Sequence, residues 1–187
     1  MNLVLASQSP RRREMIQALG LTPIIQPADI DESVLPGEAP IPHVQRLARA
    51  KCAAIAGECV LAADTIVVLD DQILGKPLGF TDFQRMMQLL SGNTHQVYTA
   101  WHIQAADQHR CGVERTDVRF GMLSESMIQA YWDSGEPHDK AGGYGIQGWG
   151  GLLVEQIEGD FNNVVGLPLK SVARALAELG LNPWRLG

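Results

Sequence analysis

The chain has 187 residues, of which 45% are hydrophobic, and its formal net charge is −6. This length and composition allow one compact domain with a sizeable core, or at most two lobes that share one sheet. The acidic balance argues against general nucleic-acid binding, which needs a broad positive surface, and no segment reaches the length of a membrane span. We therefore expect one domain over residues 1–187 that binds neither nucleic acid nor a membrane.

The cysteines and the N-terminal segment predict a cytoplasmic protein. Cys52, Cys59 and Cys111 match no zinc pattern, and their odd number argues against a disulfide framework. Such cysteines are typical of a reducing compartment. The first apolar run, Leu3–Ala6, is also too short for a signal peptide.

The first apolar run is long enough for a buried strand, and a polar turn and a helix follow it. Ser9 is placed to cap this helix, and Pro10 suits its first turn. The arginines at 11–13 are disfavoured there because a helix N-terminus already carries partial positive charge. Either this is a solvated basic turn, or the arginines, the free N–H groups and the Ser7 hydroxyl form a phosphate cradle.

Apolar spacing, glycines and prolines divide the next part of the chain into four segments. We predict a helix over Glu14–Leu19, an extended run over Thr22–Gln26, a loop over Pro27–Pro42 and a helix over His43–Ala56. The loop is acidic and contains Glu32, for which a solvated charge is the ordinary interpretation. The second helix contains Lys51, for which a solvated basic face is the ordinary interpretation. Glu32 gains weight only if it shares a metal ion with Asp64, and Lys51 is a weak candidate alone.

The run Cys59–Leu69 is the most apolar of the chain and is predicted as a buried central strand. Asp64 lies inside it, and a buried carboxylate costs several kcal/mol unless a cation or hydrogen-bond donors compensate. Asp64 therefore either belongs to a structural network or holds a metal ion or a reactive water. Thr65 follows and points to the opposite face if the strand is regular.

The rest of the chain mixes strands and helices without strict alternation, which favours a mixed sheet flanked by helices. In chain order we predict a turn at Asp70 and Asp71, a strand over Gln72–Leu74, a helix capped by Thr81 and ending at Ser91, strands over Thr94–Ala105 and Cys111–Phe120 with a turn near Asp107–His109, a helix from Ser124 to about Asp133, a strand over Trp149–Ile157, a connection over Asp160–Gly166, and a last helix after Pro168.

The segment Asp139–Gly148 contains four glycines. They permit either a close backbone approach to a ligand or a structural network of tight turns in which Asp139 pairs with Lys140 or with the backbone. Gln147 can both donate to and accept from the edge of a base. Earlier in the chain, Lys76 lies in a rigid exit from the sheet, where its ammonium group could be aimed at a phosphate.

Seven motifs, in order along nearly the whole chain, resemble the Maf family of nucleoside triphosphate pyrophosphatases. They are Ala-Ser-Gln-Ser-Pro-Arg-Arg at 6–12, Leu-Ala-Arg-Ala-Lys at 47–51, Ala-Ala-Asp-Thr-Ile-Val at 62–67, Gly-Lys-Pro at 75–77, Ser-Gly-Asn-Thr-His-Gln-Val-Tyr-Thr-Ala at 91–100, Asp-Lys-Ala-Gly-Gly-Tyr-Gly-Ile-Gln-Gly at 139–148 and Asn-Val-Val-Gly-Leu-Pro-Leu at 163–169. Each motif is weak alone, whereas the ordered set is specific. Arg13 after the arginine pair and Gly143 in place of a frequent alanine are small departures.

The resemblance implies an elongated α/β fold with a mixed central sheet, a cleft between two lobes, and hydrolysis of a nucleoside triphosphate between its α and β phosphates. It implies that Asp64 is the catalytic carboxylate, as water-activating base, metal ligand or both, and that Glu32 and Asp64 hold a divalent cation, Mg²⁺ or Mn²⁺. The residues implied in binding the triphosphate are Ser7, Arg11, Arg12, Lys51 and Lys76. The family also suggests a homodimer.

With Thr65 after Asp64 and with Gln147, the chain resembles the branch of the family that acts on dTTP and UTP. A house-cleaning role on modified pyrimidine nucleotides is a possible extension of this activity. The sister branch that prefers 7-methyl-GTP typically has Gln in place of Thr65. Two alternatives stay open at this point: an enzyme of the 7-methyl-GTP branch, and a nucleotide-binding regulator of cell division and septum formation.

Overall fold

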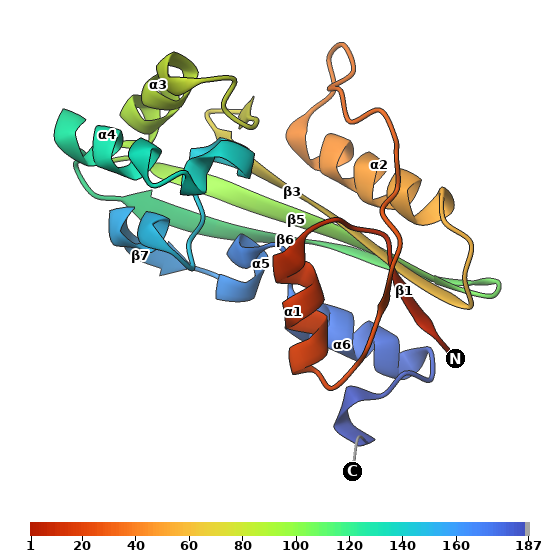
Figure 1. Cartoon of the computed structure of the whole chain (residues 1–187). Coiled ribbons are helices and arrows are strands. Elements are labelled where there is room, and N and C mark those ends of the chain that lie inside the picture. Colours follow the sequence, from red (N-terminus) through yellow and green to blue (C-terminus); the bar gives the residue numbers. More distant parts are fainter. Residues whose placement is uncertain (186–187) are drawn as a thin grey trace. The chain divides into compact units, whose positions relative to one another are not determined.

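The structure is a computed structural model that describes residues 1–185. It divides into two compact units. The first unit comprises Met1–Asp64, Thr99–Glu114 and the segment from Gly166 onward, and the second comprises Thr65–Tyr98 and Arg115–Val165. Three long strands contribute residues to both units: β3 (Cys59–Leu69), β5 (Thr94–Ala105) and β6 (Gln108–Phe120) (Figure 1).

Seven strands form one mixed sheet in the order β2-β1-β3-β5-β6-β7, and β4 pairs with β3. The four short strands are β1 (Leu3–Leu5), β2 (Ile24–Ile25), β4 (Gln72–Leu74) and β7 (Val154–Glu158). β1 is parallel to both β2 and β3, whereas β4 is antiparallel to β3 and β7 is antiparallel to β6. The expected class, a mixed sheet flanked by helices, is confirmed.

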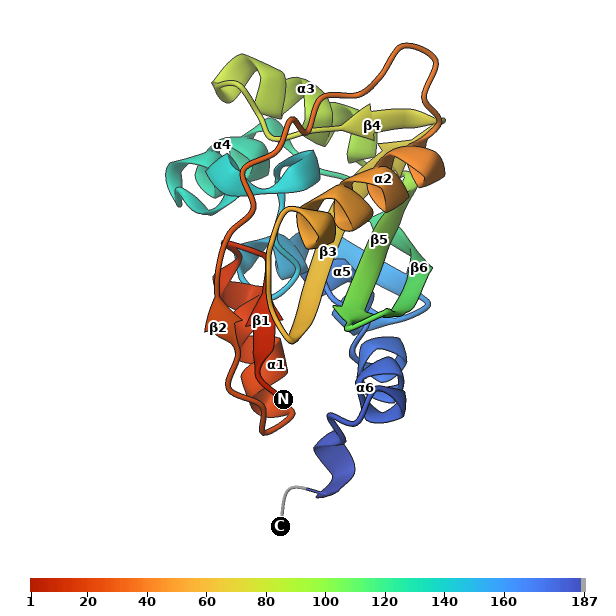
Figure 2. The ribbon, with the colours of Figure 1, turned by 90° about the vertical axis from the view of Figure 1, so that its right-hand side faces the viewer.

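In the first unit, helix α2 packs on the strands through its apolar face. Its Cys52 lies in a buried cluster with Val4 and Ala6 at β1 and with Val60 and Ala62 of β3. Figure 2 shows β2 beside β1, as their pairing requires. The helices of this unit are α1 (Pro10–Ala18), α2 (Pro40–Ala53), α6 (Leu169–Glu178) and the 3₁₀ helix η4 (Pro183–Arg185).

In the second unit, helices α3 and α4 lie side by side (Figure 1). The ring of Phe83 on α3 packs against Tyr131 and Trp132 of α4, with ring centroids 6.0 Å and 5.1 Å away. The helices of this unit are α3 (Phe80–Leu90), α4 (Glu125–Asp133), α5 (Phe161–Val165) and the 3₁₀ helices η1 (Glu136–Asp139), η2 (Ala141–Gly143) and η3 (Trp149–Leu153).

The predicted N-terminal turn is confirmed. The side chain of Ser9 accepts the backbone N–H of Arg12 and caps α1, with Pro10 in the first turn. The second helix begins at Pro40, inside the predicted loop, because proline suits the first turn of a helix. No helix among residues 1–185 is both long and apolar enough to cross a membrane.

Two predictions for the second unit are wrong. Thr81 does not cap α3, which begins at Phe80 after Gly79, and the side chain of Asp82 accepts the N–H of Leu78 instead. The strand predicted over Trp149–Ile157 is half 3₁₀ helix, since β7 begins only at Val154.

Two smaller differences from the predicted elements also have local causes. The connection predicted over Asp160–Gly166 contains the short helix α5, because the side chain of Asp160 accepts the N–H of Asn162 and starts a turn. Strand β6 begins at Gln108, three residues before the predicted start, because the hairpin turn is confined to Ala106 and Asp107.

Candidate active site

Two carboxylates converge on one ammonium group in the first unit. Lys51 Nζ lies 2.7 Å from Asp64 Oδ1 and 2.7 Å from Glu32 Oε1. Lys51 comes from α2, Asp64 from β3 and Glu32 from the acidic loop between β2 and α2. The side chains of Lys51 and Asp64 are 10% and 11% exposed, whereas that of Glu32 is 54% exposed. Lys51 is thus the cation that the buried Asp64 required, and it is not part of a solvated basic face.

Arg12 is buried beside this group. Its Nε donates to the carbonyl of Gly166 at 2.8 Å, and its Nη1 donates to Ser7 Oγ at 3.1 Å. Burial lowers the pKa of Arg12, and the charges of Asp64 and Glu32 oppose that shift. The guanidinium therefore lies within electrostatic reach of both carboxylates, and it anchors the hydroxyl of Ser7.

The remaining arginines of the turn differ from Arg12 in exposure. Arg11 is partly exposed, and Arg13 is exposed. The charge of Arg11 further lowers the pKa of Arg12, so the two guanidinium groups repel each other. Two neighbouring cations at a helix N-terminus are the arrangement that an anion would stabilise.

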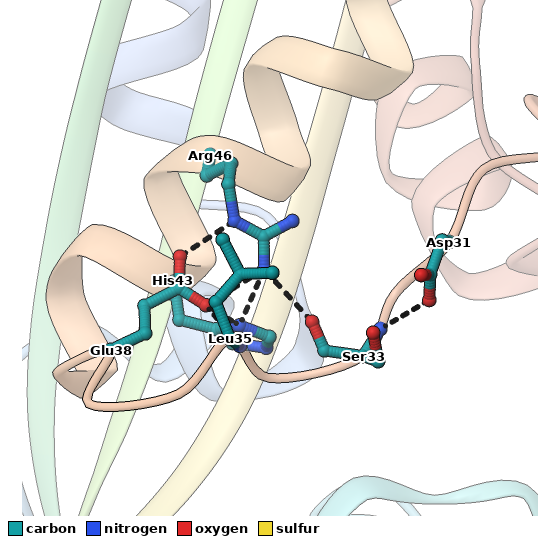
Figure 3. A network of polar contacts seen from close by, with 6 residues as sticks. All are labelled: Asp31, Ser33, Leu35, Glu38, His43 and Arg46. Carbon is teal, nitrogen blue, oxygen red and sulfur yellow. Dashed lines mark hydrogen bonds and ion pairs between the residues drawn. The ribbon is translucent and has the colours of Figure 1, made fainter.

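A network of polar side chains holds the acidic loop against α2 (Figure 3). Arg46 on α2 donates from Nε to Glu38 Oε1 at 2.6 Å and from Nη2 to Glu38 Oε2 at 2.7 Å. The same Nη2 donates to the carbonyl of Ser33 at 2.9 Å, and His43 Nδ1 lies 2.9 Å from Glu38 Oε2. The hydrogen bonds of Arg46 lower the pKa of Glu38, which keeps its carboxylate charged.

This network brackets Glu32 in the sequence. Asp31 Oδ1 accepts the N–H of Ser33 at 2.9 Å, so the residues on both sides of Glu32 are fixed (Figure 3). The sequence did not predict the pairing of Glu38 with Arg46. Their eight-residue separation across a loop and a helix start gives no periodic signal.

The two carboxylates fit a divalent cation shared with a nucleotide. Among the described residues, no three His, Cys, Asp or Glu side chains are grouped so that they could hold a metal ion. Mg²⁺ usually takes one or two carboxylates and completes its shell with phosphate oxygens and waters. Glu32 and Asp64, which already face one positive charge, offer that set of hard oxygen ligands.

The other three predicted residues belong to the second unit. Thr65 follows Asp64 on β3 and is partly buried, whereas Lys76 and Gln147 are exposed. Lys76 follows β4, and the carbonyl of the preceding Gly75 accepts the N–H of Gly142 at 2.9 Å. This bond joins the Lys76 segment to the glycine-rich segment that contains Gln147.

The glycine-rich segment is a network of tight turns. Lys140 pairs with Asp139, as one of the two interpretations required, and Gly142 and Gly143 have positive φ angles of 67° and 72°. Its residue Tyr144 is buried, and the hydroxyl lies 2.7 Å from Nε2 of the buried His95. Gln147 is therefore an exposed side chain on a segment with a fixed backbone.

Known proteins are similar to this chain over nearly its whole length. The family described as Maf-like protein matches residues 2–179. A dTTP/UTP pyrophosphatase of Hahella chejuensis is 50% identical over 97% of this chain and 94% of its own length. Proteins with the same name from Moorella thermoacetica and Pseudoalteromonas atlantica are 50% and 47% identical, over 97% and 96% of this chain and 97% of each relative.

Proposed function

Because the chain belongs to the Maf family, we propose that it is a nucleoside triphosphate pyrophosphatase that hydrolyses dTTP and UTP to the monophosphate and pyrophosphate. The relatives named dTTP/UTP pyrophosphatase are similar to it over 94–97% of their own length. The observation that carries the proposal is the buried Asp64 held by Lys51, with Glu32 and Arg12 nearby.

In the proposed reaction, a water oxygen bonds to the α phosphorus and the bond from that phosphorus to the bridging oxygen breaks, so that pyrophosphate leaves. The carboxylate of Asp64 accepts the proton of the attacking water. Lys51 holds Asp64 in place and adds positive charge where the triphosphate carries negative charge. Arg11, Arg12, Lys76 and the hydroxyl of Ser7 are the proposed contacts to the phosphates.

We further propose that Mg²⁺ or Mn²⁺ is held by Glu32 and Asp64 together with the nucleotide. When bound, such a cation supplies charge neutralisation on the phosphate oxygens. Thr65 and Gln147 are the proposed contacts to the base. We also propose that the protein is cytoplasmic and forms a homodimer. Light scattering on the purified protein measures its oligomeric state directly.

A nucleotide panel tests the activity. The protein is incubated with Mg²⁺ or Mn²⁺ and with dTTP, UTP, CTP, GTP, ATP or 7-methyl-GTP, and the products are identified by chromatography. We expect monophosphate and pyrophosphate, with the highest kcat/KM for dTTP and UTP. A strong preference for 7-methyl-GTP contradicts the pyrimidine assignment, and nucleotide binding without pyrophosphate release with either metal contradicts the enzymatic one.

A further inference from the structure

The glycine-rich segment of the second unit folds around the carboxylate of Glu136. Its Oε1 accepts the hydroxyl of Tyr131 at 2.9 Å and the N–H of Gly150 at 3.1 Å, and its Oε2 accepts the N–H of Trp149 at 2.8 Å. The hydroxyl oxygen of Tyr131 in turn accepts the N–H of Gly145 at 3.0 Å. One side chain at the start of η1 thus fixes the backbone at 145, 149 and 150.

Two glycines are needed for this closure. A Cβ at Gly148 would lie 2.1 Å from Glu136 Oε2, and a Cβ at Gly150 would lie 2.6 Å from the Tyr131 hydroxyl and 2.5 Å from the carbonyl of Gly145. Real Cβ atoms essentially never make contacts this short. At these two positions the close approach that glycine permits is therefore an approach to Glu136 and Tyr131.

The Glu136 carboxylate is well matched to its neighbours. Burial raises its pKa, but the N–H groups of Gly150 and Trp149, the hydroxyl of Tyr131 and the charge of Lys140 together outweigh burial, and the net shift is downward. A carboxylate only accepts hydrogen bonds, and three donors face it. An amide of the same shape would direct its own N–H groups toward one of these donors.

Gln147 lies between the residues that are fixed in this way. The backbone on one side is held at Gly145 through Tyr131, and the backbone on the other side is held directly by Glu136. The Gln147 side chain itself is exposed. An exposed amide side chain discriminates between bases only if its backbone is held in place. Otherwise the conformational entropy that the segment loses on binding offsets the hydrogen bonds to the base.

We propose that Glu136 is a positioning residue that sets base selectivity by holding the backbone of Gln147. This inference rests on the proposed function, because it takes Gln147 as the contact to the pyrimidine base. Glu136 itself accepts its hydrogen bonds from Tyr131, Trp149 and Gly150.

The test compares Glu136→Gln with Glu155→Gln, a control in the same unit. Glu155 is 58% exposed, and its ion pair with Arg119 is long, at 3.6 Å. We expect Glu136→Gln to lower the ratio of kcat/KM for dTTP to that for dCTP about tenfold, the effect of about one hydrogen bond. KM for dTTP should rise more than kcat falls, and Glu155→Gln should match the wild type.

Hydrogen exchange gives a readout that does not depend on turnover. The amides of Gly145, Trp149 and Gly150 should exchange faster in Glu136→Gln than in the wild type, while those of β6 should not change. If Glu136→Gln fails to fold, Tyr131→Phe replaces it, because that change removes only the hydroxyl that reaches Gly145.

A double-mutant cycle separates positioning from general structural damage. In a Gln147→Ala background, Glu136→Gln should have no further effect on the dTTP to dCTP ratio. An equal effect in both backgrounds overturns the inference, as does an unchanged ratio in the single variant. If the wild-type protein releases pyrophosphate from neither dTTP nor UTP, the proposed function is overturned instead. If the wild-type protein does release pyrophosphate and the ratio in Glu136→Gln is unchanged, only the role of Glu136 is overturned.

Discussion

The two units hold their predicted functional residues by different means. In the first unit, Asp64, Lys51 and Arg12 are buried and are held by ion pairs and hydrogen bonds between side chains. In the second unit, Lys76 and Gln147 are exposed, and the structure holds only the backbone that carries them. The first unit thus holds these residues through buried side-chain partners, whereas the second holds Lys76 and Gln147 through the backbone of the segments that carry them.

The largest expected effect is on the chemistry assigned to the first unit. Asp64→Asn removes the charge that accepts a proton, and we expect kcat for dTTP to fall about 10²–10⁴-fold. Steady-state kinetics with pyrophosphate detection measure this. Asp107→Asn, in the exposed β5–β6 turn of the same unit, is the control and should retain full activity. Full activity in Asp64→Asn would remove Asp64 from the mechanism.

Breaking the buried pair should affect stability as well as activity. Lys51→Met leaves Asp64 buried without its cation, and we expect the free energy of unfolding to fall by about 3–5 kcal/mol. Urea denaturation measures this. The double variant Lys51→Met/Asp64→Leu should recover much of the stability but none of the activity, because no uncompensated charge stays buried. Equal stability in the two variants would contradict a buried, paired role for Lys51.

The loop network in Figure 3 should affect metal dependence more than fold. Arg46→Met releases the carbonyl of Ser33 and the carboxylate of Glu38, so we expect the Mn²⁺ concentration for half-maximal activity to rise about tenfold. Hydrogen exchange in residues 31–38 should also increase. Arg49→Met is the matched control, since Arg49 is exposed on the same helix. An identical response in both variants would contradict a role for the network.

Burial of His95 in the second unit should make stability depend on pH. Burial lowers the pKa of His95 to about 4, so the unfolded chain binds a proton below about pH 6.5 that the folded chain does not. Stability should therefore fall as the pH decreases from about 6.5 to 4, by at most about 1.4 kcal/mol per pH unit. Urea denaturation at pH 7, 6 and 5 measures the slope. In His95→Phe the slope should be smaller, and an unchanged slope would contradict this assignment.

Elements with a strong local pattern were predicted from sequence with little error. The ends of β3, β4 and β5 agree with the prediction to the residue, because apolar runs and turn residues mark them locally. The strand predicted from Trp149 is wrong in its first half, because Glu136, thirteen residues earlier, binds the N–H groups at 149 and 150. A hydrogen bond of that reach leaves no mark on the local pattern.

In the candidate site too, some features were predictable from local sequence and others were not. The sequence alone determined that Asp64 is buried, because it lies in an apolar run, and it determined the family through seven ordered motifs. Only the tertiary structure decided that Lys51 compensates Asp64, that Arg12 rather than Arg13 turns inward, and that Glu136 anchors the glycine-rich segment. Burial is a property of one segment and can be read from its own residues. Pairing is a property of two segments that only the folded chain brings together, because a charge selects its partner by distance in space.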